Sequence, residues 1–449
     1  TYRSMAIAPF ISVIILIYLV INGNIESMVV AVPVLIVWSL SPVVEWWLGL
    51  PLPSQKTKVS DEQQFYLREV ARKTWAFFED MVGPADNWLP PDNLQEYPIP
   101  VVAHRTSPTN IGMSLLANLA AYDFGYTTAG DLLQRTGYTF ETMEKLDRYF
   151  GHFYNWYDTQ SLKPLHPRYI SSVDSGNLAG HLLTLRQGLL GLKSQKIIQQ
   201  KVMYALHDTI RVAIASDSQE NLALLQFKKT FEENQQLEPF TLKNTKFQLE
   251  KLSALQHELS TSLSQNKQSA LTRWLTRLSE DFKKLQEELN HLTPWLSLTV
   301  PEKFKGLKIF NGVPSLEDLA TGNQQRAELE ELKANASGED LNWLSKLSEA
   351  YDLGCKRARE RISNIESLAV QCSVYADMEY AFLYDPEQHL LAIGYNVDDH
   401  HRDASFYDLL ASEARLSSFV AIAQGKLPQE NWFALGRRLT TADNIPVLL

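Results

Sequence analysis

The chain is poor in cysteine and in basic residues, and it lacks the common nucleotide-binding and hydrolase motifs. Its two cysteines, Cys355 and Cys372, are too few for a disulfide framework or a zinc site of four cysteines, and they fit a reducing compartment. The 42 Lys and Arg residues stand against 52 Asp and Glu residues, a formal net charge of −10. This balance argues against a broad phosphate-binding face, so no nucleic-acid partner is expected. No Walker loop, GxGxxG, HExxH or GxSxG motif supports nucleotide chemistry or serine hydrolysis.

The 449 residues, 45% of them hydrophobic, can bury a large core and predict two to four domains at about 150 residues per domain. Residues 5–21 and 29–44 carry no charge, and each run can nearly cross a hydrocarbon layer about 30 Å thick. Trp46 and Trp47 are typical of an interfacial anchor. We therefore predict a transmembrane hairpin within residues 1–53, with a signal peptide and a buried core hairpin as the alternatives.

Prolines interrupt these apolar runs at Pro9, Pro33 and Pro42. Membrane helices tolerate them where neighbouring helices, or here the hydroxyls of Ser39 or Ser41, satisfy the freed carbonyls. The loop between the runs has no Lys or Arg, whereas both flanks are basic, with Arg3, Lys56 and Lys58. The positive-inside rule therefore places both ends in the cytoplasm.

Beyond a linker over residues 51–60 (PLPSQKTKVS), helix signals alternate with Gly, Pro and Asn rather than with strand patterns. The soluble part is therefore predicted to be mainly α. Helices are expected over residues 61–82, 110–121 and 175–192. We divide the soluble part into segments 54–194, 195–370 and 371–449.

Residues 195–370 are rich in Gln, Lys, Glu and Leu. Apolar residues there follow the a/d pattern of a coiled coil, at Leu271, Leu275, Leu278, Phe282, Leu285, Leu289 and Leu292. A shorter leucine stripe from Leu249 to Leu263 could pair with it. We predict an antiparallel helical hairpin or small bundle inserted into a larger domain. Its charged face is either solvated surface or a docking surface for another domain.

Strand alternation is credible only over residues 375–395, around the turn DPEQ, where we predict one small β-hairpin. A loop then leads into a helix from about Tyr407 to Gln424, which Gly425 should end.

Two segments concentrate aromatic rings, carboxylates and turns. In residues 151–182, Tyr154, Trp156 and Tyr157 adjoin Asp158, and Asp174 stands just before a helix. The rings could simply be core, and Asp174 could cap the helix. Alternatively these residues line a sugar cleft, since apolar sugar faces stack on rings while sugar hydroxyls need donors and acceptors.

The second segment holds Asn396, Asp398, Asp399, His400, His401, Asp403, Tyr407, Asp408, Glu413 and Arg415. Adjacent histidines cannot easily face one ion and no second ligand cluster is evident, so no metal site is predicted. Small residues surround Glu413 and leave steric room beside its carboxylate. From spacing alone, an ordinary surface glutamate is the alternative.

Three stretches together resemble the cyclic β-1,2-glucan synthases. They are HRTSPTNIGMSLLANLAAYDFGY (104–126), GHFYNWYDT with PRYISSVDSGNLAGHL (151–182), and FLYDP with GYNVDDHHRDASFYDLLASEARLSSFVAIAQGKLPQENWFALGRRL (382–439). The resemblance spans nearly the whole chain. It implies the last membrane hairpin plus the N-terminal part of the cyclisation, or glucoamylase-like, domain. The implied fold is a partial (α/α)6 toroid with the helical insertion and the β-hairpin.

The resemblance also implies retaining transglycosylation of linear β-1,2-glucan, in which the chain's own terminal hydroxyl replaces water. By motif, Glu413 would be the general acid/base. The residues expected to contact the sugar are Tyr154, Trp156, Tyr157, Asp158, Asp174, Asn396, Asp398, Asp399, Tyr407, Asp408 and Arg415. The nucleophile is expected in a later glutamate motif. Because the chain starts without Met and has too few residues for twelve toroid helices, we expect a catalytically incomplete fragment.

The expected partners are β-1,2-glucan, the membrane, and the glycosyltransferase and phosphorylase-like domains of the same full-length chain. No cofactor is expected in this region, because UDP-glucose and a divalent metal would serve only the separate transferase domain. The implied location is a bacterial inner membrane with the soluble part in the cytoplasm. Two other functions stay open: a non-catalytic module that binds or guides glucan, and a β-1,2-glucan hydrolase, which exclusion of water from the acceptor site would rule out.

Overall fold

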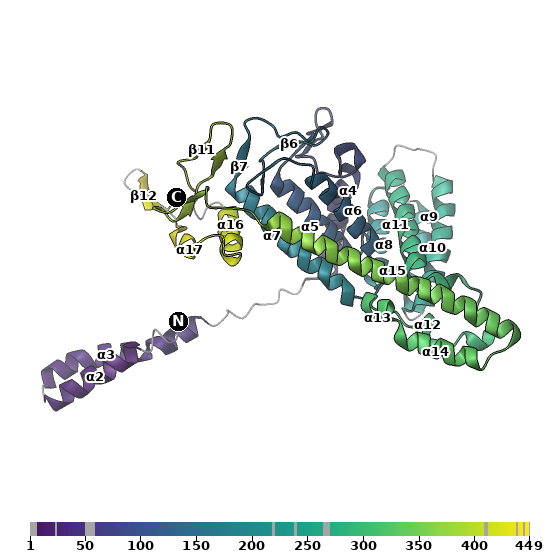
Figure 1. Ribbon diagram of the computed structural model, residues 1–449, viewed down its shortest axis with the longest axis horizontal. Helices are drawn as coiled ribbons and strands as arrows, with labels where there is room; N and C mark the ends of the chain where they lie inside the picture. Colours follow the sequence, from purple (N-terminus) through teal and green to yellow (C-terminus); the bar gives the residue numbers. More distant parts are fainter. Residues whose placement is uncertain are drawn as a thin grey trace. The chain divides into compact units, whose positions relative to one another are not determined.

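The computed structural model describes residues 7–22, 25–49, 59–217, 221–237, 240–263, 270–407, 412–436, 439–442 and 445–448. It consists of two compact units, Thr1–Gln64 and Phe65–Leu449, drawn in Figure 1. Most of the predicted linker, and the predicted site residue Asp408, lie outside the described residues.

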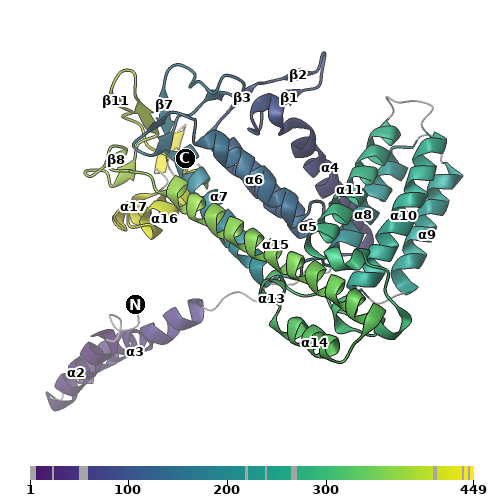
Figure 2. The same cartoon turned by 45° about the vertical axis from the view of Figure 1, so that its right-hand side comes forward.

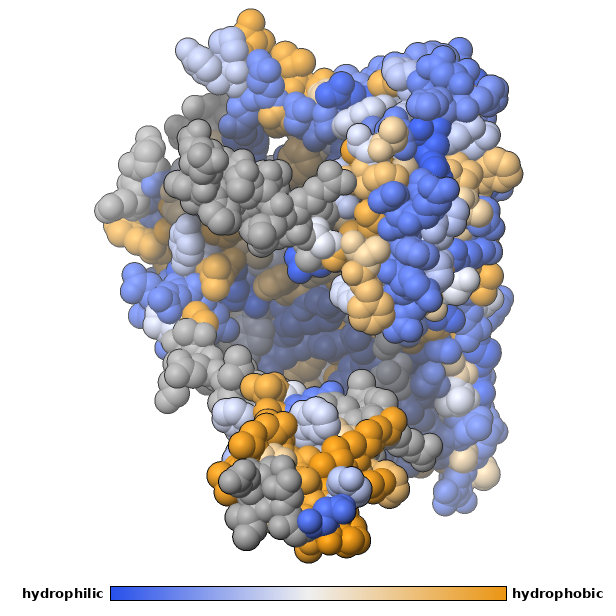
Figure 3. All heavy atoms as spheres, turned by 90° about the vertical axis from the view of Figure 1, so that its left-hand side faces the viewer, coloured by the Kyte–Doolittle hydropathy of each residue, from blue (hydrophilic) through white to orange (hydrophobic). Residues whose placement is uncertain are grey.

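The N-terminal unit contains two apolar helices, α2 (Ile7–Ile21) and α3 (Ile25–Leu48). Most of their side chains are exposed, and Figure 3 shows the hydrophobic surface that results. Of the helices in the described part of the chain, α3 is long and apolar enough to cross a membrane over Met28–Leu48, whereas α2 is shorter. By length and composition, α3 is thus a candidate for the second predicted span, whereas α2 falls short over the residues described. The transmembrane hairpin itself stays a prediction.

Helix α3 continues through Pro33 and Pro42. A proline at position 42 cannot donate to the carbonyl of Trp38, four residues earlier. The Ser41 hydroxyl donates to that carbonyl oxygen at 2.8 Å. This is the serine compensation that the sequence predicts, and it explains how an apolar helix accommodates the proline without leaving a bare acceptor.

The second unit is mainly helical, which confirms the predicted fold class. Helices α4 (Asp61–Met81), α5 (Pro108–Phe124) and α7 (Ser172–Gly191) lie where the sequence predicts them. The other helices of the described part are α6 (Ala129–Met143), α8 (Lys201–Ala215), α9 (Leu222–Leu237), α10 (Leu242–Leu263), α11 (Ala270–Leu292), α12 (Lys308–Asn311), α13 (Leu316–Thr321), α14 (Asn323–Ala334), α15 (Gly338–Ala376), α16 (Ser412–Ala423) and α17 (Glu430–Ala434).

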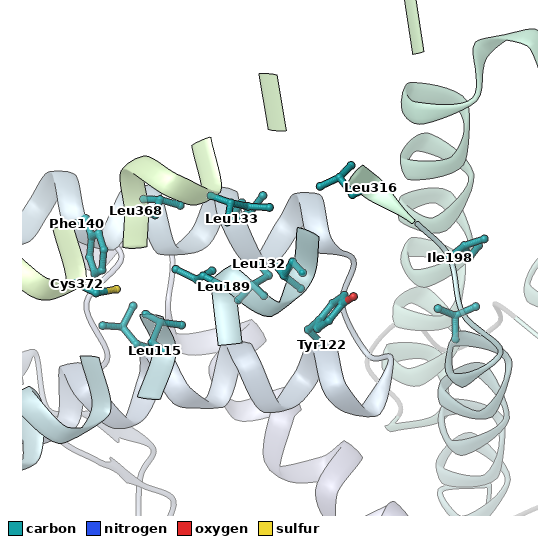
Figure 4. Packing of buried hydrophobic residues seen from close by; sticks show 14 of the residues in the cluster. Leu115, Tyr122, Leu132, Leu133, Phe140, Leu189, Ile198, Leu316, Leu368 and Cys372 are labelled. Atoms are coloured by element: carbon teal, nitrogen blue, oxygen red, sulfur yellow. The ribbon is translucent and has the colours of Figure 1, made fainter. Parts of the chain in front are cut away.

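A large hydrophobic core runs through this unit, and a second, smaller cluster is formed by Trp75, Ala121, Tyr126 and Ala205. The large core joins side chains of α5, α6 and α7 to those of the long helix α15, as Figure 4 shows for Leu115, Phe140, Leu189, Leu368 and Cys372. Both cysteines are buried free thiols on α15. Helix α15 runs past residue 370, the predicted end of the insertion. The segment limits themselves, and the toroid, stay predictions.

The heptad seam lies on α11, whose buried side chains are those of the predicted a/d positions from Leu275 to Leu292. Helix α11 packs against α10, which carries the shorter leucine stripe. The predicted helical pair is therefore confirmed. Its core is continuous with that of the neighbouring helices.

Six small sheets connect the helices in the described residues. The predicted hairpin is confirmed in a shorter form, with β8 (Tyr384–Asp385) paired to β9 (Leu390–Leu391). The expectation of a single strand pair is wrong. Further pairs are β1 (Leu94–Gln95) with β2 (Val101–Val102), β3 (Arg105–Thr106) with β6 (Tyr157–Asp158), β4 (Arg148–Tyr149) with β5 (His152–Phe153), and β12 (Leu439–Ala442) with β13 (Ile445–Leu448). Strands of two to four residues are too short to produce a visible alternation.

Candidate functional site

A three-stranded sheet brings the two predicted site segments together. Strand β10 (Gly394–Asn396) pairs with β11 (His401–Arg402) on one side and with β7 (Tyr169–Ser171) on the other. A Cβ at Gly394 would lie 2.3 Å from the carbonyl oxygen of Ile170, so the pairing requires a glycine there. The residues before α7 and those before α16 therefore lie beside each other.

Asp398 links the two segments through hydrogen bonds. Its carboxylate accepts hydrogen bonds from the backbone N–H of Arg168 at 2.8 Å, from Arg168 Nε at 2.6 Å and from His166. These donors, the Arg168 backbone first, hold the pKa of Asp398 well below its ordinary value. The structure thus places this predicted sugar-binding residue in a structural ion pair between the two segments.

Asp174 lies in the first turn of α7, but it does not cap that helix. The cap is Ser171, whose hydroxyl accepts from the Asp174 N–H. The Asp174 carboxylate accepts instead from Thr109 Oγ1 on α5 at 2.6 Å, and from the Asn155 amide at 3.1 Å. Asn177 in turn donates to Thr109 Oγ1 at 3.1 Å. The carboxylate is thereby oriented by two donors outside its own helix.

Helix α16 packs against α7 at very short range. A Cβ at Gly176 would lie 2.4 Å from Ser417 Cα and 2.1 Å from its Oγ, so glycine is required for this contact. Gly176 follows Asp174 by two residues, and Ser417 follows Glu413 by one turn and donates to its carbonyl oxygen at 2.9 Å. The contact therefore brings the first turns of α7 and α16, each with an acidic residue, to one place.

Tyr407 lies among these acidic residues. Burial raises its pKa first of all, and the charges of Asp174, Glu413 and Asp403 raise it further. The pKa of Tyr169 is raised likewise by burial and by its hydrogen bond to Asp403. We call Asp174, Asp403, Glu413, Tyr169 and Tyr407 the acidic cluster. Glu413 is exposed, and its carboxylate accepts no hydrogen bond from the residues described.

The aromatic residues of the first segment differ in burial: some lie in the core beneath the site, and one is partly exposed. Tyr157 is fully buried, and its hydroxyl is held between the backbone N–H of Tyr154 and the carbonyl of Asp147. The expectation that Tyr157 contacts sugar is therefore wrong: it supports the site from the core. Tyr154 is 5% exposed. Trp156 is half-buried; its indole N–H donates to Asn155, and the Arg105 guanidinium covers its ring at 4.7 Å.

The remaining predicted site residues form hydrogen bonds within their own loops or are exposed to solvent. Asp158 accepts from the N–H and hydroxyl of Ser161, which closes a turn and lowers the pKa of the carboxyl. Asn396 donates to Asp399 and accepts from backbone N–H groups of its own loop. Arg415 is exposed on α16.

Sequence reasoning missed Thr109, Asn155 and Tyr169 as site residues. All three stand inside the resembling motifs, and for Thr109 and Tyr169 the available signal was a hydroxyl near a helix start. Asn155 gives no signal of its own, because only the fold brings it to Asp174.

Carboxylates and tyrosine hydroxyls gathered at two helix starts can donate protons, accept them and orient neutral hydroxyl groups. Within the described residues, no group of three or more His, Cys, Asp and Glu side chains is placed to hold a metal ion. The arrangement suits proton transfer to a polyhydroxyl substrate.

His152 is a buried support beneath this cluster. Its Nε2 donates to the carbonyl of Glu379 at 2.6 Å, and its Nδ1 lies 2.8 Å from the Ser175 hydroxyl on α7. Burial lowers its pKa from 6.5 to about 4. The unfolded chain therefore binds this proton first as the pH falls, and stability present above pH 6.5 is lost between pH 6.5 and pH 4, by about 3 kcal/mol.

We therefore expect His152→Gln to flatten the pH dependence of the unfolding free energy between pH 6.5 and pH 4. Urea titrations at several pH values measure it. The same change at the exposed His257 on α10 is the matched control. An unchanged slope in His152→Gln would show that this imidazole is not held neutral.

No family model matches the chain. The cyclic β-(1,2)-glucan synthase NdvB of Rhizobium meliloti (strain 1021) is 31% identical over 464 residues, which cover 97% of this chain and 14% of that protein. The chain thus spans about one seventh of the length of this curated relative. A crystal structure assigned to a glucoamylase of Bacteroides fragilis NCTC 9343 is 24% identical, covers 30% of this chain and 33% of its own, and superposes with a TM-score of 0.25.

The similarity to NdvB agrees with the family that the three motifs predict. The candidate membrane helix and this similarity together indicate a membrane-associated chain. Over nearly its whole length, the chain is similar to one segment of the cyclic β-(1,2)-glucan synthase NdvB.

Proposed function

We propose that this segment is the cyclisation part of a membrane-bound cyclic β-1,2-glucan synthase, and that it closes linear β-1,2-glucan into rings by retaining intramolecular transglycosylation. The observation that carries the proposal is the contact of Gly176 with Ser417, which joins the helix starts bearing Asp174 and Glu413. The negative charges of both carboxylates act on Tyr407. A glycosyl transfer needs an acid and oriented hydroxyl partners at one place.

In the proposed reaction, Glu413 gives its proton to the glycosidic oxygen as the bond from that oxygen to the anomeric carbon breaks. A carboxylate nucleophile from another part of the synthase takes the anomeric carbon. The terminal hydroxyl of the same glucan then attacks that carbon, returns a proton to Glu413 and releases the nucleophile. One glycosidic bond breaks and one forms, and no water is consumed.

Asp174 and Tyr407 orient glucan hydroxyls in this proposal, and Trp156 offers part of its ring to a sugar face. The glucan comes from the transferase domain of the same full-length chain, and a phosphorylase-like domain is its other partner. UDP-glucose and a divalent metal serve the transferase alone, so this segment works without a cofactor. We place the membrane helices in a bacterial inner membrane and the site on its cytoplasmic side.

The test is to incubate the full-length synthase with linear β-1,2-glucan of defined length and to analyse the products by mass spectrometry. Rings lighter by one water than linear chains of the same number of glucose units support the proposal. Shorter linear chains alone would replace it with hydrolysis. Binding without any product would replace it with a glucan-guiding module.

A further inference from the structure

A polar groove of about 470 Å³ lies between helices α6 and α15, with one residue from the end of α11. Both helices run side by side in Figure 2 and contact each other. Its lining includes Gln134, Gly137, Tyr138, His291, Arg357 and Asn364. We call it the α6–α15 groove. None of the acidic cluster lines it, and its volume is that of a small-ligand site.

Gly137 is the residue that packing does not explain. It lies in the middle of α6, where glycine costs about 1 kcal/mol relative to alanine. A Cβ built on Gly137 meets nothing within 4 Å. Gly130, one further glycine of α6, differs, since its Cβ would lie 2.7 Å from Glu288 Oε2. The space above Gly137 is therefore left open to something other than the described protein.

The wall beside Gly137 combines an aromatic ring with amide groups. The Tyr138 ring packs on Trp88 with centroids 4.6 Å apart. Its hydroxyl accepts from Gln134 Nε2 at 3.2 Å, so its own proton remains to donate. Asn364 adds an exposed amide from α15. A ligand with many hydroxyl groups finds both donors and acceptors along this wall.

The lining residues of the groove carry equal numbers of positive and negative charges. The lining contains two arginines, Arg357 and Arg361, and two glutamates, Glu141 and Glu360. Arg361 is already paired with Glu288 at 2.9 Å, and Arg357 donates to the carbonyl of His291 at 2.9 Å. A phosphate or another polyanion would meet carboxylates here, whereas a neutral chain meets no net field. The groove therefore favours a neutral polyhydroxyl ligand.

We propose that the α6–α15 groove binds a second stretch of glucan chain, apart from the acidic cluster. The identity of the sugar as β-1,2-glucan rests on the proposed function. A second contact gives a long chain two attachment points, which raises the effective concentration of one stretch once the other is bound. The stretch in the groove stays outside the reaction.

The experiment titrates the 449-residue protein with linear β-1,2-glucan oligosaccharides by calorimetry. Gly137→Leu adds a side chain to the groove at a position where its Cβ meets nothing within 4 Å, and we expect binding at this site to weaken by about tenfold or more. Gly191→Leu is the matched control, because Gly191 ends α7 and its Cβ also meets nothing within 4 Å. Thermal melting checks that both variants fold.

Trp156→Ala separates this inference from the proposed function. If Gly137→Leu and Trp156→Ala each remove part of the binding, both ideas are supported. If Trp156→Ala abolishes binding and Gly137→Leu leaves it at the wild-type value, the groove is not a glucan site and the proposed function still stands. Binding that depends on Gly137 and not on Trp156 supports the groove and counts against the acidic cluster as the glucan site. No binding by the wild type overturns the groove as a glucan site.

Discussion

Replacing Glu413 by Gln in the full-length synthase is expected to slow ring formation by about 10²–10⁴-fold, because the amide cannot transfer the proton that the leaving oxygen requires. The fold should be retained, since Glu413 is exposed and substitutions at such positions change stability by about 0.5 kcal/mol or less. Ring formation is measured by mass spectrometry as a function of time.

Glu430→Gln is the matched control for this prediction. Glu430 is also an exposed glutamate in the first turn of a helix, α17, but it does not belong to the acidic cluster. We expect it to leave the rate of ring formation as in the wild type. Wild-type rates in Glu413→Gln would refute Glu413 as the acid/base, while a loss in both variants would indicate a general effect on the C-terminal helices.

Replacing Arg72 by Met is expected to lower the unfolding free energy by about 3–5 kcal/mol. Arg72 on α4 is fully buried, and it joins Glu79 at 2.7 Å and Asp281 on α11 at 3.4 Å. Its Nε donates to Thr209 Oγ1 at 2.9 Å. Burial raises the pKa of Asp281 from 3.8 to about 6. Without the guanidinium, a desolvated carboxylate remains without its main counter-ion.

Two measurements identify the cause of that loss. Adding Asp281→Asn to Arg72→Met should return part of the stability, because it removes the stranded charge. The loss should also shrink as the pH falls from 7 towards 4, since a carboxyl with a raised pKa binds its proton more readily in the folded state. Lys283→Met on α11 removes the same charge from an exposed pair and should cost at most about 0.5 kcal/mol. Equal losses in both Met variants would contradict the argument.

The elements that could be predicted from the sequence are those determined by residues close together in the chain. The α11 seam follows from apolar residues at heptad spacing, and α4, α5 and α7 follow from helical periodicity with Ser or Pro near their starts. The Ser41 compensation at Pro42 could be foreseen because both partners lie within one turn. In each case a few neighbouring residues determine the structure.

The site was less predictable because distant residues build it. Glu413 and Asp174 could be chosen by resemblance, but their common neighbour Tyr407 and the donors Thr109 and Asn155 depend on tertiary contacts. The same limit explains the error at Tyr157. A ring in an aromatic run looks the same in sequence whether it faces a ligand or, as here, the core.

The pairing of β7 with β10 has a consequence for folding during synthesis on the ribosome. Its two strands are about 220 residues apart in the chain. At a translation rate of about 5–20 residues per second, β7 emerges about 10–45 s before its partner exists. During that interval the start of α7, with Asp174, has neither strand β10 nor helix α16 to cover it. The helices made in the meantime, α8 to α15, can fold on local contacts. The site is therefore assembled late, after these helices have folded.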